Sequence, residues 1–206
     1  MSNSSEILNY WFEGITDNQV IDKNHLPVKK WFSGGKRVDL EIKERFENTL
    51  ISARDGFCKA WESSLPGQLA LIILFDQFSR NIYRGRPKMF ETDPFALNLS
   101  LSLRQEKLDQ KFSFIERIFL YMPLMHSEDI KIQHLSVQSF EQLLSDVVQK
   151  KPDNRFYFEG NLYYAKQHCS TIERFGRFPH RNIILQRVST DEEKEFLSGS
   201  LRLPGR

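Results

Sequence analysis

Three charged residues repeat at helical spacing directly after the most apolar run of the chain. Asp76, Arg80 and Arg84 stand at positions i, i+4 and i+8, and residues spaced by four share one face of a helix. The preceding run, 69–75, is apolar on every side, which is typical of a fully buried helix. Because a buried ion must be compensated, the row either closes on itself as an ion pair or lines a polar site. In such a site the two arginines would bind an anion and Asp76 would orient them.

A second polar group, His126, Glu128 and Asp129, surrounds the expected N-terminus of a helix. Ser127 would cap this helix and the two acids would complement its dipole, which accounts for the acids but not for His126. Histidine exchanges a proton near neutral pH, so His126 and Glu128 are candidate catalytic residues. Asp129, and Gln133 one turn beyond it, are candidate ligand-binding residues.

Arginine is concentrated in the segment 174–187, which contains no acid. Planar guanidinium groups fit carboxylate and phosphate oxygens, so Arg177, Arg181 and Asn182 are candidate ligand-binding residues. His180 is a candidate acid or base. The alternatives are that these arginines cap helix ends, that they pair with the acids of the first two groups, or that they contact nucleic acid.

Metal chemistry has little support in the sequence. The chain has neither the His-Glu-x-x-His motif of zinc enzymes nor the paired Glu-x-x-His motifs of di-iron proteins. A looser set of His126, Asp129 and His168 stays open, and His168 is also a candidate ligand-binding residue. Cys58 and Cys169 stand far apart in half-apolar settings, which favours buried thiols. We therefore predict no metal site and no cofactor.

Helices must position these groups, because no segment shows the sustained alternation of a strand. Asp39, Asp93 followed by Pro94, and Ser127 are expected to begin helices, and Pro123 is expected to end one. Thr190 and Glu193 form a capping box for a last short helix, and Gly176 is expected to end the helix before it. We expect helical segments near 6–12, 28–32, 39–61 with an interruption at Gly56, 66–84, 95–103, 112–121, 127–148, 155–175 and 190–197. The sequence thus predicts one all-α domain over 1–206, with eight or more antiparallel helices and no sheet.

Three motifs resemble an uncharacterised bacterial family, domain of unknown function nine-two-four. They are LFDQFSRNIYRG at 74–85, FLYMPLMHSED at 119–129 and RFGRFPHRN at 174–182, and the likeness extends from Trp11 to Leu197. The resemblance implies a TPR-like right-handed superhelix, although the tetratricopeptide consensus itself is not visible in the residues. It implies no activity, because the family has no established one.

Composition excludes several classes of protein. Of the 206 residues 40% are hydrophobic and 27% charged, an ordinary globular balance, and a net charge of +2 makes no overall case for nucleic acid or a membrane. The longest apolar run is far shorter than the roughly 20 residues of a membrane span. The N-terminus lacks the basic and apolar regions of a signal peptide. We expect a soluble cytoplasmic protein with no membrane partner.

The three polar groups are expected to converge on one Arg/His-lined cleft that binds an anionic small molecule or an acidic peptide. Alternatively, the same cleft is the active site of a hydrolase-type enzyme in which His126, Glu128 and His180 transfer protons. In a third interpretation, a concave helical face is a scaffold for a protein partner. The sequence leaves open whether turnover occurs and whether the chain forms a homo-oligomer.

Overall fold

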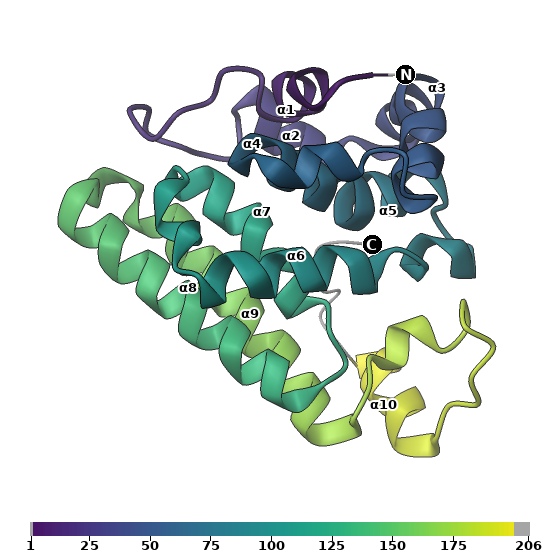
Figure 1. Cartoon of the computed structure of the whole chain (residues 1–206). Helices are drawn as coiled ribbons and strands as arrows, with labels where there is room; N and C mark the ends of the chain where they lie inside the picture. Colours follow the sequence, from purple (N-terminus) through teal and green to yellow (C-terminus); the bar gives the residue numbers. More distant parts are fainter. Residues whose placement is uncertain (1, 200–206) are drawn as a thin grey trace.

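The computed structural model describes residues 2–199, and every regular element in this range is a helix (Figure 1). The prediction of an all-α protein without a sheet is therefore confirmed for these residues. The helices are α1 Ser4–Phe12, α2 Leu26–Ser33, α3 Gly35–Arg54, α4 Leu65–Ile72, α5 Ser79–Ile82, α6 Asp93–Gln105, α7 Phe114–Met125, α8 Ile130–Lys150, α9 Arg155–Phe175 and α10 Asp191–Gly199. The TPR-like superhelix and the single domain stay predictions, and both ends of the predicted domain, 1 and 200–206, lie outside the described residues.

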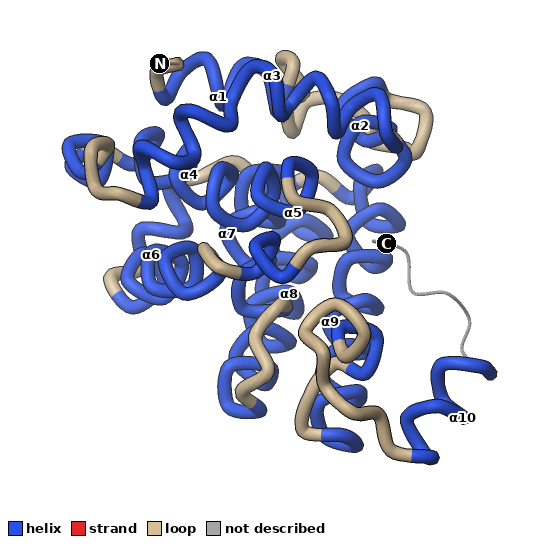
Figure 2. Tube along the Cα trace, turned by 90° about the vertical axis from the view of Figure 1, so that its right-hand side faces the viewer, coloured by secondary structure: helices blue, strands red, loops and turns tan. Residues whose placement is uncertain are grey.

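The helices form two regions that meet at α6 and α7. Helices α1 to α5 lie on one side, whereas α8 and α9 run side by side on the other (Figures 1 and 2). Helix α10 and the loop before it lie beyond the C-terminal end of α9. Within residues 2–199, no helix is both long enough and apolar enough to cross a membrane.

Aromatic rings hold the N-terminal helices to α7. The ring of Trp11 lies 5.4 Å from that of Phe78 and 5.5 Å from that of Phe119, and Trp31 lies 4.7 Å from Phe119. The indole of Trp31 also donates a hydrogen bond of 2.9 Å to the Trp11 carbonyl. Edge-to-face ring pairs add about 0.5–1.5 kcal/mol each beyond the area they bury. The core therefore fixes the segment around Phe78, which carries Asp76, against α7, whose C-cap is His126.

The predicted central helix contains a wide π-helical turn at Ile73–Phe78, between α4 and α5. Such turns are rare and are often found at functional sites, and Asp76 lies within this one. Arg80 follows on α5 and approaches Asp76 to 3.4 Å, as its spacing predicts. The helix ends at Ile82, so Arg84 leaves the common face and its Nε pairs with Asp39 at 2.6 Å. The predicted stripe of three charged residues is thus wrong at Arg84.

Pro123 does not end α7, which continues to Met125. Leu124 and Met125 are both buried on this last turn, and tertiary burial overrides the local penalty of a proline near a helix end. The extra turn places His126 at the C-terminus of the helix.

Of three predicted helix starts, one is found and two are wrong. Helix α6 does begin at Asp93, although Thr92 and not Asp93 is its N-cap, whereas Asp39 lies inside α3, which begins at Gly35. Asp129, not Ser127, caps α8 by accepting from the amide of residue 131 at 2.7 Å. An acid near a helix start can serve as a cap or point elsewhere, and Asp39 and Asp93 instead accept hydrogen bonds from arginines.

The last two predicted helices are correct. Helix α9 spans Arg155–Phe175 and ends at Gly176, whose φ of 66° is the left-handed conformation that glycine adopts readily. Thr190 and Glu193 form the predicted capping box at the start of α10: the Thr190 amide donates to the Glu193 carboxylate at 2.8 Å, and the Glu193 amide to Thr190 Oγ1 at 3.2 Å.

Candidate functional site

One residue from each of the three polar segments meets at the C-terminus of α7. Asp76 Oδ1 and His126 Nδ1 are 2.7 Å apart, and Arg181 donates to the carbonyl of His126 at 2.9 Å. These residues are separated by 50 and 55 positions in the chain. We refer to Asp76, Arg80, His126 and Arg181 as the Arg181 centre.

Asp76 is almost completely buried, with 1% of its surface exposed. It also accepts a hydrogen bond of 2.6 Å from Gln77. Burial opposes its ionisation, but the charges of Arg80 and His126 outweigh burial and hold its pKa at about 2. Ionised Asp76 only accepts hydrogen bonds, so the proton between the two side chains lies on His126 Nδ1. That proton orients the ring and leaves Nε2, for which residues 2–199 provide no hydrogen bond, as the second reactive nitrogen.

Arg80 is fully engaged with acids. Its two terminal nitrogens lie 2.8 and 3.1 Å from the oxygens of Asp93, and one also donates to the carbonyl of Asp76 at 2.8 Å. Burial lowers its pKa, but Asp76 and Asp93 outweigh burial and raise the pKa above its usual value. Arg80 is therefore a permanent positive charge in a closed ion pair.

Arg181 differs from Arg80 because no carboxylate of the described range lies within ion-pair distance of it. Only 7% of its surface is exposed, and its Nε has no hydrogen-bond partner. Its guanidinium carbon lies over two aromatic rings, 4.8 Å from the centroid of Phe90 and 4.4 Å from that of Phe178. Burial, followed by the charge of Arg80, lowers its pKa to about 10. Arg181 is thus a buried cation held by aromatic faces and one carbonyl, with an unused donor.

Two more histidines border the centre through Phe178. The ring of His168 lies 5.3 Å from Phe178 and 6.4 Å from His126, and the ring of His180 lies 5.5 Å from Phe178. His168 Nδ1 is 2.8 Å from the carbonyl of Tyr164. Burial, followed by the charge of His126, lowers the pKa of His168 to about 4, so its ring is neutral at physiological pH.

Glu128 is engaged by Arg187, which the sequence analysis did not single out as a site residue. The two terminal nitrogens of Arg187 lie 2.7 and 3.0 Å from the Glu128 carboxylate, which also accepts from the Phe178 amide at 2.8 Å. Burial opposes ionisation of Glu128, but Arg187 and the Phe178 amide keep its pKa below the usual value. Asn182 accepts a hydrogen bond of 3.0 Å from the Nε of Arg187. These contacts fasten the loop after α9 to the start of α8.

Arg177 and Arg84 lie outside the Arg181 centre. Arg177 donates two hydrogen bonds to Glu193, at 2.7 and 2.8 Å, and one to the carbonyl of Val188 at 2.9 Å. Arg84 donates to both oxygens of Asp39, at 2.6 and 2.8 Å. Both arginines therefore form complete ion pairs.

Asp129 and Gln133 shape the chain next to His126. Asp129 caps α8 through two backbone amides. Gln133 is buried and donates from Nε2 to the carbonyls of Met125, at 2.7 Å, and Ser127, at 2.5 Å. Gln133 therefore fixes the backbone on both sides of His126.

Sequence analysis missed several partners of these groups, chiefly Asp93, Phe90, Arg187 and Glu193. The sequence pattern marks Asp93 and Glu193 only as helix-start residues, and it gives no spacing signal that joins them to arginines far along the chain. Arg187 lies in the acid-free segment 174–187, and this local excess of positive charge is the one sequence signal that could have identified it as a partner of a distant acid.

Two surface pockets lie away from the Arg181 centre. The first, of about 390 Å³, includes Asp17, Arg117 and Asp146. The second, of about 750 Å³, is lined by residues of α6, α8 and the connection between α6 and α7, such as Arg104 and Gln138. No predicted site residue lines either pocket. Neither pocket corresponds to the predicted Arg/His-lined cleft.

Over residues 2–199, the fold and the site together define an all-α protein in which a buried network of ion pairs surrounds Arg181, which no described carboxylate pairs with. The chain belongs to the DUF924 family of bacterial proteins of unknown function, whose model matches residues 7–200. It is 31% identical to a protein of unknown function, ATU0120 from Agrobacterium tumefaciens, whose solved structure superimposes with a TM-score of 0.75 and matches over 96% of this chain and 97% of that one. A comparison with curated proteins finds no match. The family resemblance of the three motifs is thereby confirmed.

Proposed function

We propose that the Arg181 centre binds a small anion through a carboxylate or phosphate group. The observation that carries this proposal is the buried guanidinium of Arg181, which has no carboxylate partner and an unsatisfied Nε among the described residues. Leaving a cation in that state costs free energy. An anion that accepts a hydrogen bond from Nε would remove this cost.

The charges of the surroundings support an anion at this point. Three arginines (Arg80, Arg181 and Arg187) face three acids (Asp76, Asp93 and Glu128), but each acid accepts from a group other than Arg181. Within residues 2–199, Arg181 is therefore the member of this group without an ion-pair partner, although Asp93, Glu128 and Asp76 lie near enough to act on its charge. The neighbouring charge of Arg80 would strengthen binding, since charges interact more strongly where water is scarce. A free small anion and the carboxylate end of an acidic peptide share this chemistry.

A second candidate function is proton transfer by His126, and the 2.7 Å contact between Asp76 and His126 Nδ1 favours it. A carboxylate that holds one nitrogen of a histidine prepares the other nitrogen to act as an acid or a base. An anionic substrate bound by Arg181 would lie next to this histidine. Glu128 has no part in this proposal, because its two oxygens already accept from Arg187 and the Phe178 amide.

Calorimetric titration at constant ionic strength tests anion binding, with inorganic phosphate, acetate and a short peptide with an acidic C-terminus as probes. Replacing Arg181 by methionine should weaken binding of the preferred probe by about 10- to 100-fold, the worth of a hydrogen bond to a charged group. Arg84→Met is the matched control and should leave the affinity unchanged, because Arg84 is already paired with both oxygens of Asp39. Equal affinity in wild type and Arg181→Met would refute the proposal.

Turnover is tested separately, with phosphomonoester and carboxylic ester substrates. If His126 transfers a proton, His126→Gln should abolish turnover while the affinity for the anion stays within about threefold, because the donors of Arg181 are retained. Absence of turnover in the wild type would remove the second candidate function and leave the first standing.

A further inference from the structure

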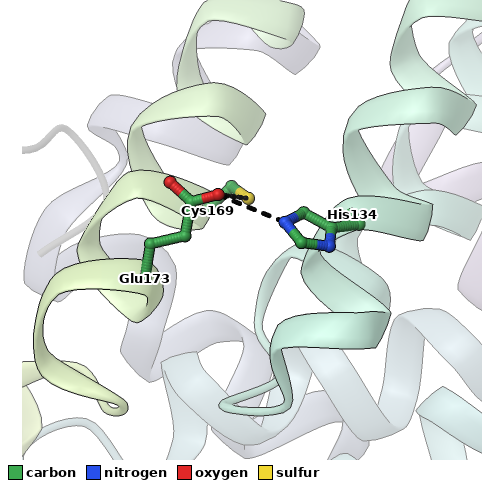
Figure 3. A group of neighbouring side chains, drawn as sticks. All are labelled: His134, Cys169 and Glu173. Atoms are coloured by element: carbon green, nitrogen blue, oxygen red, sulfur yellow. Dashed lines mark hydrogen bonds and ion pairs between the residues drawn. The ribbon is translucent and has the colours of Figure 1, made fainter.

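Helices α8 and α9 bring together three side chains that carry different metal-binding atoms: His134, Cys169 and Glu173 (Figure 3). Cys169 and Glu173 are one turn apart on α9 and share a face, and His134 points toward them from α8. His134 Nε2 lies 3.2 Å from Glu173 Oε1, and Cys169 Sγ lies 3.8 Å from the same oxygen. All three atoms lie within 4.8 Å of one another.

These separations can be compared with those that a tetrahedral zinc ion requires. Zinc binds sulfur at about 2.3 Å and nitrogen or oxygen at about 2.0–2.2 Å, so pairs of ligand atoms at the tetrahedral angle are about 3.3–3.6 Å apart. The distances of 3.2 and 3.8 Å are within a few tenths of an ångström of these edges. The third pair, His134 Nε2 and Cys169 Sγ, lies within 4.8 Å. His134 and Glu173 are more than half exposed, with 56% and 54% of their side chains accessible, so both have room to turn toward a shared ion.

We propose that His134, Cys169 and Glu173 bind Zn²⁺, with a water molecule as the fourth ligand. A thiolate together with an imidazole selects zinc over magnesium and calcium, which prefer oxygen ligands alone. On binding, the Cys169 S–H bond breaks, a sulfur–zinc bond forms and the proton passes to solvent. Because the other two ligands are exposed, the ion can enter from solvent.

Without a metal, these contacts contribute little to stability. An exposed histidine–carboxylate pair is worth about 0–1 kcal/mol, and a thiol is a weak hydrogen-bond donor. A bound ion would instead join α8 to α9 through three bonds. The sequence predicted no metal because His134 lies 35 and 39 residues before the two α9 ligands, and only the pairing of the helices brings them together.

This site is independent of the anion site proposed above. None of its three ligands belongs to the Arg181 centre, so either proposal can fail without the other. Cys169 does follow His168 in the chain, but His168 is engaged with the carbonyl of Tyr164.

Titration with Co²⁺ of the full chain, reduced and freed of metal with a chelator, tests the proposal. We expect one ion per chain, the visible absorption of tetrahedral cobalt and a sulfur-to-cobalt charge-transfer band, all removed by added Zn²⁺. The charge-transfer band should vanish in Cys169→Ser and persist in Cys58→Ser, which replaces the other buried thiol. His134→Ala and Glu173→Gln should each weaken Zn²⁺ binding at least about 10-fold. His25→Ala, which removes another partly exposed histidine, should not.

Three results would overturn the proposal: no saturable binding of one ion, a charge-transfer band that survives in Cys169→Ser, or a band that disappears in Cys58→Ser. Circular dichroism establishes that each variant is folded. If Cys169→Ser is unfolded, His134→Ala decides the question, because an exposed side chain can be removed without disturbing the core. Unchanged zinc affinity in His134→Ala would then refute the site.

Discussion

Arg177 and Arg181 are four residues apart in the same loop, yet their surroundings are opposite. Arg177 is partly exposed and donates three hydrogen bonds, two of them to the carboxylate of Glu193. Arg181 is more buried, but it donates to a single carbonyl and no acid of residues 2–199 pairs with it. The more desolvated arginine is thus the one with fewer partners, although burial makes partners more important.

The difference between Arg177 and Arg181 shows how an arginine with a structural role can be distinguished from one that is a candidate for ligand binding. The capping box at the start of α10 fixes Glu193 in a position where it pairs with Arg177. The ion pair therefore helps to hold α10 against the loop that follows α9. Arg181 is held in place by two aromatic rings that supply no full negative charge. An arrangement that positions a buried cation without a direct ion-pair partner is suited to a ligand, and it adds little to stability.

The largest effect is expected from removing the acid that pairs with Arg177, because this should destabilise α10. Glu193 is 2% exposed and accepts from Arg177, Asn182 and the Thr190 amide. Its replacement by alanine should destabilise α10 by about 2–3 kcal/mol, since hydrogen bonds to a charged group are worth about 1.5–3 kcal/mol each and are not additive. Hydrogen exchange of the α10 amides measures this.

The matched control is Glu192→Ala. Glu192 is on the same turn and pairs with Arg174 at 2.8 Å, but both side chains are more than half exposed. Exposed pairs contribute little, so α10 should keep its protection. Equal loss of protection in the two variants would contradict the structural role of the Arg177–Glu193 pair.

A smaller effect is expected on acidification. Hydrogen bonds from Arg177 hold the pKa of Glu193 at about 2, below the usual value of 4.5. The folded state therefore binds this proton more weakly than the unfolded state does. The pair stabilises α10 fully above pH 4.5, and this contribution is lost as the pH falls toward 2.

Hydrogen exchange or circular dichroism between pH 5 and about 2 follows this loss. Glu193→Gln cannot ionise, so its α10 should be less stable than wild type at pH 5 and should converge with wild type at the acid end. A constant difference between the two proteins over the whole range would show that the ionised carboxylate is not what holds α10.

The features that the sequence predicted correctly are those determined by residues close together in the chain. Burial of the run 69–75, the glycine after α9 and the capping box at Thr190 depend on residues within a few positions of one another, and all three are found. The predicted end at Pro123 failed because burial of the last turn of α7 overrode a local rule.

The pairing of charges was beyond sequence reasoning, because it depends on contacts between distant segments. Asp93 and Arg80 are 13 residues apart, and Glu128 and Arg187 are 59 apart. Arg177 and Arg181 look alike in the sequence, and only the position of α10 determines that Arg177 receives an acid.

The smallest expected effect is also the sharpest test of the comparison. Replacing Arg181 by methionine should change the free energy of unfolding by no more than about 0.5–1 kcal/mol. The variant loses one hydrogen bond, worth about 0.5–1.5 kcal/mol, and leaves the carbonyl of His126 without that donor. It also removes the desolvation cost of an unpaired cation, and apolar replacements of buried charges are often neutral or stabilising. Methionine can still pack against the rings of Phe90 and Phe178, since its sulfur makes favourable contacts with aromatic rings.

Urea unfolding of Arg181→Met beside Arg187→Met decides between the two roles of a buried arginine. Arg187→Met leaves Glu128 without its main partner and should cost about 2–3 kcal/mol, because a partly buried carboxylate is then uncompensated. If Arg181→Met is as costly, then Arg181 is a structural residue like Arg187 and the contrast with Arg177 disappears. If Arg181→Met is nearly neutral but loses anion binding, the unpaired charge serves a ligand at the expense of stability, as is typical of functional sites.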